Sequence, residues 1–175
     1  MSHFWFIPIL LLVFLFEGTL FQWLIPSELK LMTGLSPHVM LVIVLYISLF
    51  LRRRLGTVLG LLFGLLHDFI YYGFMIGPFA FGIGVTSYIA GVMTARAKLT
   101  LFSTMMVMSF SFILFEHFLY GIYYLFQVID FSYEWTLMHV MIPNVVFHLL
   151  FALMLYIPLR WLIDKMKAKP KEEER

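Results

Sequence analysis

Six ionisable side chains lie within long apolar stretches, where any chemistry would have to proceed away from water. They are Glu17, His67, Asp68, Glu116, His117 and His148. Carboxylates and imidazoles in such positions can form a ligand pocket, a proton relay or a catalytic site, or a buried hydrogen-bonded network that fixes which helices meet. A charge at the bilayer centre costs about 2.5 to 3.5 kcal/mol on insertion scales. We therefore expect these groups to face the protein interior.

The spacing of these residues does not favour catalysis. The zinc-protease pattern His-Glu-x-x-His is absent, and Glu116 and His117 point in adjacent directions on a helix. No Gly-x-Ser-x-Gly element or phosphate-binding glycine loop occurs, and an intramembrane hydrolase would need a nucleophile or metal beside the His and Glu set. The absence of cysteine excludes thiolate catalysis and disulfides. The sequence predicts neither an enzyme, nor a metal site, nor a cofactor.

The composition indicates an integral membrane protein. Of the 175 residues, 62% are hydrophobic and 13% are charged, whereas soluble domains carry roughly 25% charged residues. The formal charge of +2 is too small to suggest a nucleic-acid partner. The apolar runs follow one another so closely that residues 1–175 are expected to form one all-α membrane domain.

Six stretches are candidates for helices that cross the bilayer, which takes about 20 residues. They cover residues 4–25, 37–51, 55–72, 74–95, 99–126 and 136–163. The second and third are short and are separated only by Arg52, Arg53 and Arg54, so this pair could instead form a re-entrant hairpin. The sequence predicts a six-helix transmembrane bundle with a short cytoplasmic tail over residues 164–175.

The basic residues predict the orientation, because Lys and Arg accumulate on cytoplasmic loops. Eleven of the twelve fall on one side of the predicted spans, namely Arg52, Arg53, Arg54, Arg96, Lys98, Arg160, Lys165, Lys167, Lys169, Lys171 and Arg175. Only Lys30 falls on the other side. Both termini and the triple-arginine turn are therefore predicted to lie in the cytoplasm.

Small residues form stripes on the third and fourth predicted helices. Gly56, Gly60 and Gly64 recur at intervals of four on one helix, and the other carries Gly77, Ala80, Gly84, Ser87 and Gly91. Small side chains let helices approach closely in lipid, where burying apolar side chains gains little. We expect these two helices to pack tightly and antiparallel.

Asp68 continues the glycine ridge by one more step of four, so it is expected near that helix contact. Counted along each span, Glu17 and Asp68 share a depth in the outer half of the membrane. A histidine such as His117 or His148 can donate a hydrogen bond to Asp68 without adding a second full charge. Two interpretations of Asp68 stay open: recognition of a partner, and a buried structural contact.

Three short elements follow one another between residues 37 and 95. Pro37 opens the second predicted helix, Gly64, Leu65 and Asp68 form a Gly-Leu-x-x-Asp element, and Gly77 leads into the fourth helix. In this order the elements resemble those of the MreD family of rod-shape-determining membrane proteins. His38 stands where the family often has an acidic residue.

The resemblance implies a non-enzymatic component of the bacterial elongation machinery in the plasma membrane, acting with MreC. It implies links to the peptidoglycan synthases, RodA and a class B penicillin-binding protein, and to MreB filaments through cytoplasmic loops. The family is also similar to the six-helix substrate-binding components of energy-coupling-factor vitamin transporters. The alternative function is therefore a vitamin-binding transporter component, with a cavity that opens outward beneath residues 26–36.

Overall fold

The computed structural model describes residues 6–24, 38–70, 75–95 and 99–168. The regular structure in these ranges is helical: α1 Phe6–Leu24, α3 Val39–Phe50, α4 Arg53–Ile70, α5 Pro78–Thr94, α6 Leu101–Leu125, α7 Tyr133–Thr136, the π-helix η1 Leu137–Met141 and α8 Ile142–Ala168. Since α7, η1 and α8 follow one another without a break, they form one long helix. The all-α prediction is confirmed for these ranges, and the predicted loop over residues 26–36 lies outside them.

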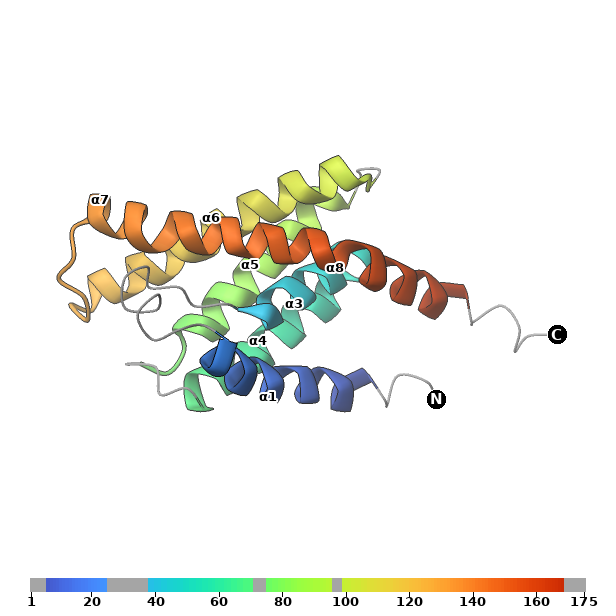
Figure 1. Cartoon of the computed structure of the whole chain (residues 1–175), viewed down its shortest axis with the longest axis horizontal. Helices are drawn as coiled ribbons and strands as arrows, with labels where there is room; N and C mark the ends of the chain where they lie inside the picture. The colour runs from blue at the N-terminus through green and yellow to red at the C-terminus, as the bar shows by residue number, and fades with distance from the viewer. Residues whose placement is uncertain (1–5, 25–37, 71–74, 96–98, 169–175) are drawn as a thin grey trace.

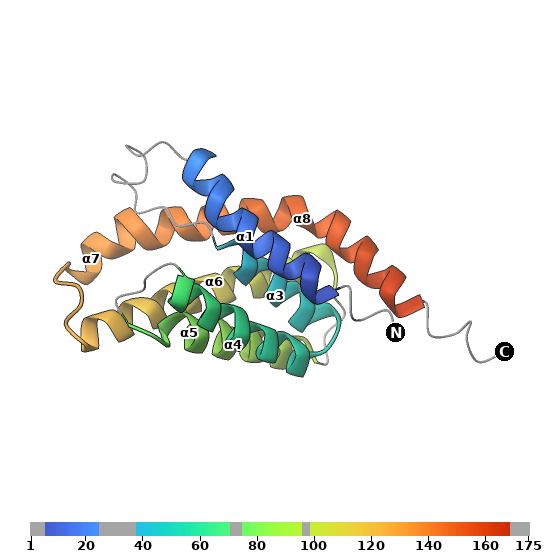
Figure 2. The same cartoon turned by 90° about the horizontal axis from the view of Figure 1, so that it is seen from below.

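The helices form an elongated bundle, seen from two sides in Figures 1 and 2. The start of α1, the end of α8 and the turn between α3 and α4 lie at one end of the bundle, and α7 lies at the other (Figure 1). Two helical runs in the described ranges are long and apolar enough to cross a membrane, Leu101–Leu125 and Tyr133–Ile163. Three shorter apolar helices accompany them, Pro8–Gly18, Val39–Phe50 and Pro78–Thr94.

The short helix α3 forms the centre of the bundle. All twelve of its residues are buried, and it contacts α1, α4, α5 and α8. Its sequence from Val39 to Phe50 is almost entirely apolar, so every side of the helix can pack against protein. Twelve residues rise only about 18 Å, less than the roughly 30 Å of a hydrocarbon core. The first turn of α3 therefore lies inside the protein and needs acceptors from other helices.

Glycines bring α4 and α5 into close contact. A Cβ atom on Gly60 would lie 3.3 Å from the Gly84 Cα, and one on Gly64 would lie 2.6 Å from the Ala80 Cα. A Cβ on Gly84 would lie 2.6 Å from a methyl group of Leu61. Larger side chains at these positions would push the two helices apart.

Two glycines of the predicted stripes do not lie at the contact between α4 and α5. Gly56 faces Ser48 of α3, where a Cβ would lie 2.5 Å from the Ser48 Cβ. The reason is that each step of four residues rotates the ridge by about 40°, which turns its first member toward α3. Gly77 precedes α5, and no atom of the described residues lies within 4 Å of a Cβ placed on it.

Candidate functional site: buried polar groups at three helix contacts

The predicted polar residues separate into three groups at different helix contacts. Asp68 lies at the start of α5; Glu17, His67 and His148 lie around the start of α3; Glu116 and His117 lie between α6 and η1. Glu17 and Asp68, which the sequence predicts at one depth in the outer half of the membrane, belong to different groups. The structure instead distributes these side chains according to which helix end each one contacts.

Asp68 accepts hydrogen bonds from the first N–H groups of α5. Its Oδ2 accepts from the Gly77 N–H at 3.0 Å and from the Ala80 N–H at 3.2 Å, and its Oδ1 accepts from the Phe79 N–H at 3.3 Å. Pro78, between them, has no N–H to satisfy. The carboxyl group is 2% exposed, and its position at a helix N-terminus is also electrostatically favourable. Backbone donors thus take the place of the histidine donor that the sequence suggested.

Two glycines allow this Asp68 cap to form. Gly64 lets α4 approach the backbone of Ala80, which brings the side chain one turn later beneath the start of α5. Gly77 has φ +120°, a conformation that side chains other than glycine rarely adopt, and its N–H points to the Asp68 carboxylate. Gly64, Asp68 and Gly77 therefore act as one structural unit that joins α4 to α5.

The other members of the family-like motif have different places. Leu65 is 39% exposed on the outer side of α4, and Pro37 lies just before the described residues. His38, the residue after that proline, is 7% exposed and forms the N-cap of α3.

The start of α3 is satisfied by side chains from α1 and α8. The Met40 N–H donates to Glu17 Oε2 at 2.9 Å, and the His38 N–H donates to His148 Nε2 at 2.9 Å. Because Nε2 of His148 accepts this bond, it carries no proton. Glu17 and His148 are both buried, so each uses its polar atom to complete an internal helix end.

Aromatic rings surround the side chain of His38. Four rings have centroids within 6 Å of its own: Phe79 at 5.0 Å, His67 at 5.3 Å, Phe115 at 5.6 Å and His148 at 5.7 Å. His67 also stacks on Phe79 at 4.0 Å. The three histidines thus form an aromatic cluster between α3, α4 and α8.

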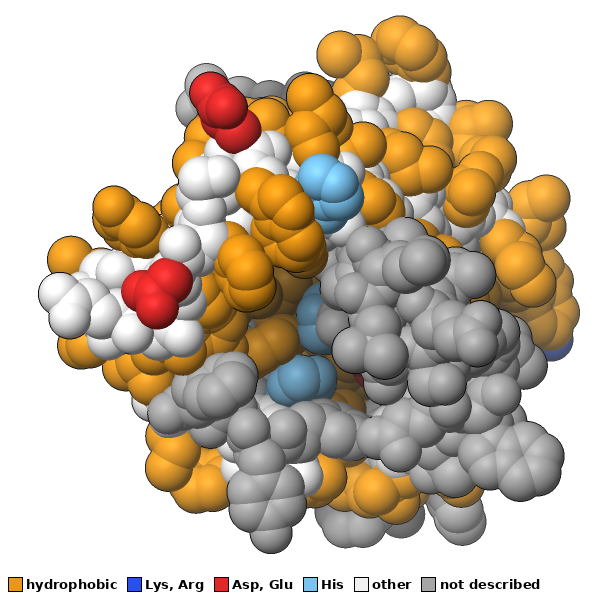
Figure 3. Space-filling model, turned by 60° about the vertical axis from the view of Figure 1, so that its left-hand side comes forward, with side chains coloured by type: hydrophobic (Ala, Val, Ile, Leu, Met, Phe, Trp, Pro, Cys, Tyr) orange, Lys and Arg blue, Asp and Glu red, His pale blue; other side chains and the backbone are white. Residues whose placement is uncertain are grey.

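Figure 3 shows a hollow at the α7 end of the bundle, with histidine side chains visible inside it. Hydrophobic side chains line much of the visible wall. A hollow with imidazole groups in a largely hydrophobic wall can bind a small molecule by apolar contact and by a few hydrogen bonds.

Glu116 differs from the other buried carboxyl groups because one of its oxygens is not satisfied within the described chain. Its side chain is 6% exposed and hydrogen-bonds Asn144 of α8. Its Oε1 is buried and has no hydrogen-bond partner among the described residues. A buried polar atom without a partner costs free energy, especially where lipid rather than water surrounds the protein.

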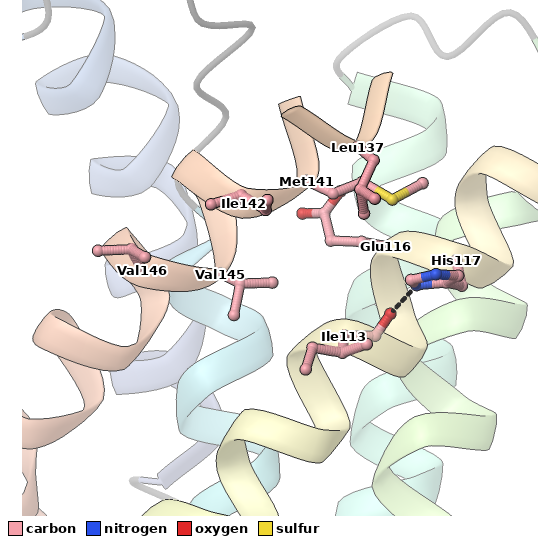
Figure 4. Close-up of a pocket in the computed structure, with 8 residues that line it drawn as sticks. All are labelled: Ile113, Glu116, His117, Leu137, Met141, Ile142, Val145 and Val146. Carbon is pink, nitrogen blue, oxygen red and sulfur yellow. Dashed lines mark hydrogen bonds between the residues drawn. The ribbon is translucent and has the colours of Figure 1, made fainter. Parts of the chain in front are cut away.

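A pocket of about 210 Å³ adjoins Glu116 between α6 and the η1–α8 helix. Its lining consists of Ile113, Glu116, His117, Leu137, Met141, Ile142, Val145 and Val146. In Figure 4 the Glu116 side chain extends from α6 toward η1. Ile142 and Val146 are about half exposed, so the pocket opens on the outer surface of the helices. It lies beside a π-helical turn, a feature frequent at functional sites.

His117 connects α6 to α7. One ring nitrogen pairs with the Ile113 carbonyl at 2.8 Å, shown in Figure 4, and the other pairs with the Tyr133 hydroxyl at 2.9 Å. Both ring nitrogens are therefore engaged at the rim of the pocket, and neither bonds to Asp68.

Within the described ranges, no three His, Cys, Asp or Glu side chains are placed to hold a metal ion. The polar side chains instead form hydrogen bonds with backbone groups or with other side chains at helix contacts. The described residues combine helical structure, two apolar helical runs of membrane length and buried polar groups at helix ends, which is typical of helical membrane proteins.

The sequence matches the family of the rod shape-determining protein MreD over residues 2–166, and the chain belongs to this family. Its general role is therefore in the determination of rod shape, in the membrane. Comparisons with curated proteins and with solved structures find no match. The predicted similarity to vitamin-transporter components stays a prediction.

Sequence reasoning missed His38 and Asn144 as members of these polar groups. The family-like proline had drawn attention to position 38, but its N–H and ring contacts depend on α8 and α4. Asn144 lies in an apolar run between Pro143 and Val145. Such an uncharged polar residue within a membrane helix is a usable signal for an interhelical hydrogen bond.

Proposed function

We propose that the chain is a non-enzymatic scaffold of the cell-elongation complex that binds MreC and positions the peptidoglycan synthases, RodA and a class B penicillin-binding protein. The pocket beside Glu116 receives a transmembrane helix of a partner. Family membership supports the setting, and the unsatisfied Glu116 oxygen supports the site.

The Glu116 oxygen carries this proposal because lipid tails offer no hydrogen-bond donor. A partner helix with a hydroxyl, amide or indole group at the same depth would complete the bond and cover the half-exposed Ile142 and Val146. The free-energy cost of the unsatisfied oxygen in the isolated chain would be removed in the complex, which would stabilise the complex.

Co-purification of MreC with the tagged full chain in mild detergent tests the proposal. Val146→Trp fills the pocket and should reduce recovery of MreC about tenfold, equivalent to ~1.4 kcal/mol. Met154→Trp, at a position 74% exposed on the same helix, is the matched control and should leave recovery unchanged. Equal recovery in both variants would assign the partner to another surface.

The proposed topology has six spans with both termini and the Arg52–Arg54 turn in the cytoplasm. The chain has no cysteine, so single cysteines report without background. Ser27→Cys and Ser132→Cys should react with an impermeant maleimide in intact cells, and Arg53→Cys and Lys169→Cys should not. The reverse pattern would invert the orientation.

The hollow at the α7 end supports a second candidate function, binding of a vitamin-like small molecule. That function requires a compound that remains with the protein through mild purification and is lost in His67→Ala. Mass spectrometry of extracts from the purified wild type and variant distinguishes it from the scaffold function, which needs no such compound.

A further inference from the structure

A second cavity lies at the opposite end of the bundle from α7, under the turn between α3 and α4. Its volume is about 520 Å³, within the roughly 300–1,000 Å³ typical of ligand sites. The lining residues are Ser48, Leu49, Leu51, Arg52, Arg53, Arg54, Gly91, Thr94 and Ala95. The cavity is therefore bounded by the end of α3, the start of α4 and the end of α5.

The cavity is strongly cationic. Its three consecutive arginines are exposed, and none forms an ion pair with a described carboxylate. Asp68, the acidic residue of α4, is fifteen residues beyond Arg53, or about 22 Å along the helix. The Arg53 guanidinium lies over the Tyr88 ring at 5.3 Å, which holds it beside α5.

The partial charges at the helix ends offset only a small part of the positive charge of the three arginines. The C-terminal ends of α3 and α5 each favour a cation with about half a negative charge, while the start of α4 contributes about half a positive charge. Three guanidinium groups exceed that requirement by more than two positive charges. In addition, the first hydrogen bond of α4 runs from the Gly56 N–H to the Arg52 carbonyl. The N–H groups of residues 53–55 therefore have no acceptor within α4 and can donate to an anion.

The packing below the arginines keeps the cavity open. Ser48 donates to the Ser87 carbonyl, and Thr94 donates to the Ala90 carbonyl at 3.0 Å, so both hydroxyl groups are held against the helices. Gly91 lies against Arg53 and leaves no side chain in the space. A basic flank that serves topology alone needs no such cavity.

We propose that this cavity binds the phosphate headgroup of an anionic phospholipid. Arginine suits this ligand because its planar group bonds phosphate oxygens in pairs. The surface beside the cavity suits acyl chains rather than a free ion, since Leu55, Tyr88, Val92 and Met93 are 39 to 46% exposed on α4 and α5. Basic pockets between membrane helices are known to take acidic lipid headgroups.

Native mass spectrometry of the full purified chain tests this site, with phosphatidylglycerol and phosphatidylcholine as the lipid probes and inorganic phosphate as a competitor. The wild type should bind phosphatidylglycerol in preference to phosphatidylcholine, and millimolar phosphate should not abolish binding. The triple variant Arg52→Gln, Arg53→Gln, Arg54→Gln should lose on the order of a hundredfold in affinity. The tail variant Lys167→Gln, Lys169→Gln, Lys171→Gln removes the same charge and should bind normally.

A cavity-filling variant separates a built site from diffuse charge and avoids any effect of the arginines on insertion. Ala95→Trp keeps all three arginines but occupies the space between them and α5, so it should weaken phosphatidylglycerol binding about tenfold. Wild-type affinity in Ala95→Trp would overturn the proposal. Complete displacement by phosphate, with no preference between the lipids, would assign the site to a free anion and overturn it equally. Preferential capture of an acidic peptide over either lipid would do the same.

Discussion

Asp68 and Glu116 are both carboxylic acids within helices and are almost equally buried, at 2% and 6% exposure. Asp68 accepts three backbone hydrogen bonds from the start of α5. Glu116 bonds Asn144 through its side chain, and its Oε1 has no partner within the described chain. Burial alone therefore does not separate a structural carboxyl group from one available to a partner.

The difference follows from what each side chain faces. Asp68 faces a helix N-terminus, where orphan N–H groups need acceptors. Glu116 faces side chains of η1 and α8 across an apolar pocket, in the middle of a continuous helical run and not at its N-terminus. Glu17 resembles Asp68 in this respect, because it completes the start of α3. We expect the helix-capping carboxyl groups to contribute to stability, whereas Glu116 is the group proposed above to bind a partner.

The largest expected effect is that of Asp68→Leu. Three buried N–H groups would lose their acceptor, which should lower the free energy of unfolding by about 3 kcal/mol or more. The measurements are the yield of folded protein and the midpoint of thermal unfolding in mild detergent. A partner-recognition role alone would leave both unchanged.

Asp68→Asn serves as the graded control for this prediction. The amide oxygen can still accept from Gly77 and Ala80, but its NH₂ group then meets the Phe79 N–H, where two donors oppose each other. A loss of about 1 to 2 kcal/mol is expected, between wild type and leucine. Equal unfolding midpoints for the two variants would contradict the cap.

A smaller effect is expected for Gly64→Ala, which tests the close approach that brings Asp68 to α5. The new methyl group would meet backbone atoms of Ala80, so the helices must separate at a cost of about 1 to 3 kcal/mol. Gly121→Ala is the matched control, because no atom of the described part of the chain lies within 4 Å of a Cβ there. It should be neutral or stabilising by up to about 1 kcal/mol. A change in unfolding midpoint for Gly64→Ala no larger than that for Gly121→Ala would contradict the close contact at Gly64.

The sequence could predict those features that depend on local pattern. Hydrophobic length located the helical runs, and the intervals between glycines suggested where α4 and α5 approach. The bonding partners of Asp68 were not predictable, because they depend on where α5 begins and on the positive φ of Gly77. Equally, Glu17 and His148 are 131 residues apart in the sequence, and only the burial of α3 brings them to one helix end.

The smallest effect on stability is expected for Glu116→Leu. Replacing its carboxyl group by an apolar side chain removes the unsatisfied Oε1 but also takes the bond from buried Asn144. The free energy of unfolding should fall by only about 1 kcal/mol, in contrast to Asp68→Leu. Co-purification of MreC should nevertheless fall about tenfold, because the donor on the partner helix loses its acceptor.

Glu116→Gln distinguishes a hydrogen-bonding role from a need for charge. Glutamine keeps an acceptor oxygen at the same reach, so it should retain most of the MreC that Glu116→Leu loses. If Glu116→Leu and Glu116→Gln both bind MreC as the wild type does, while Asp68→Leu alone loses MreC, the pocket beside Glu116 is not the partner site. If instead Glu116→Leu unfolds as readily as Asp68→Leu, then Glu116 is structural as well, and the distinction between the two carboxyl groups does not hold.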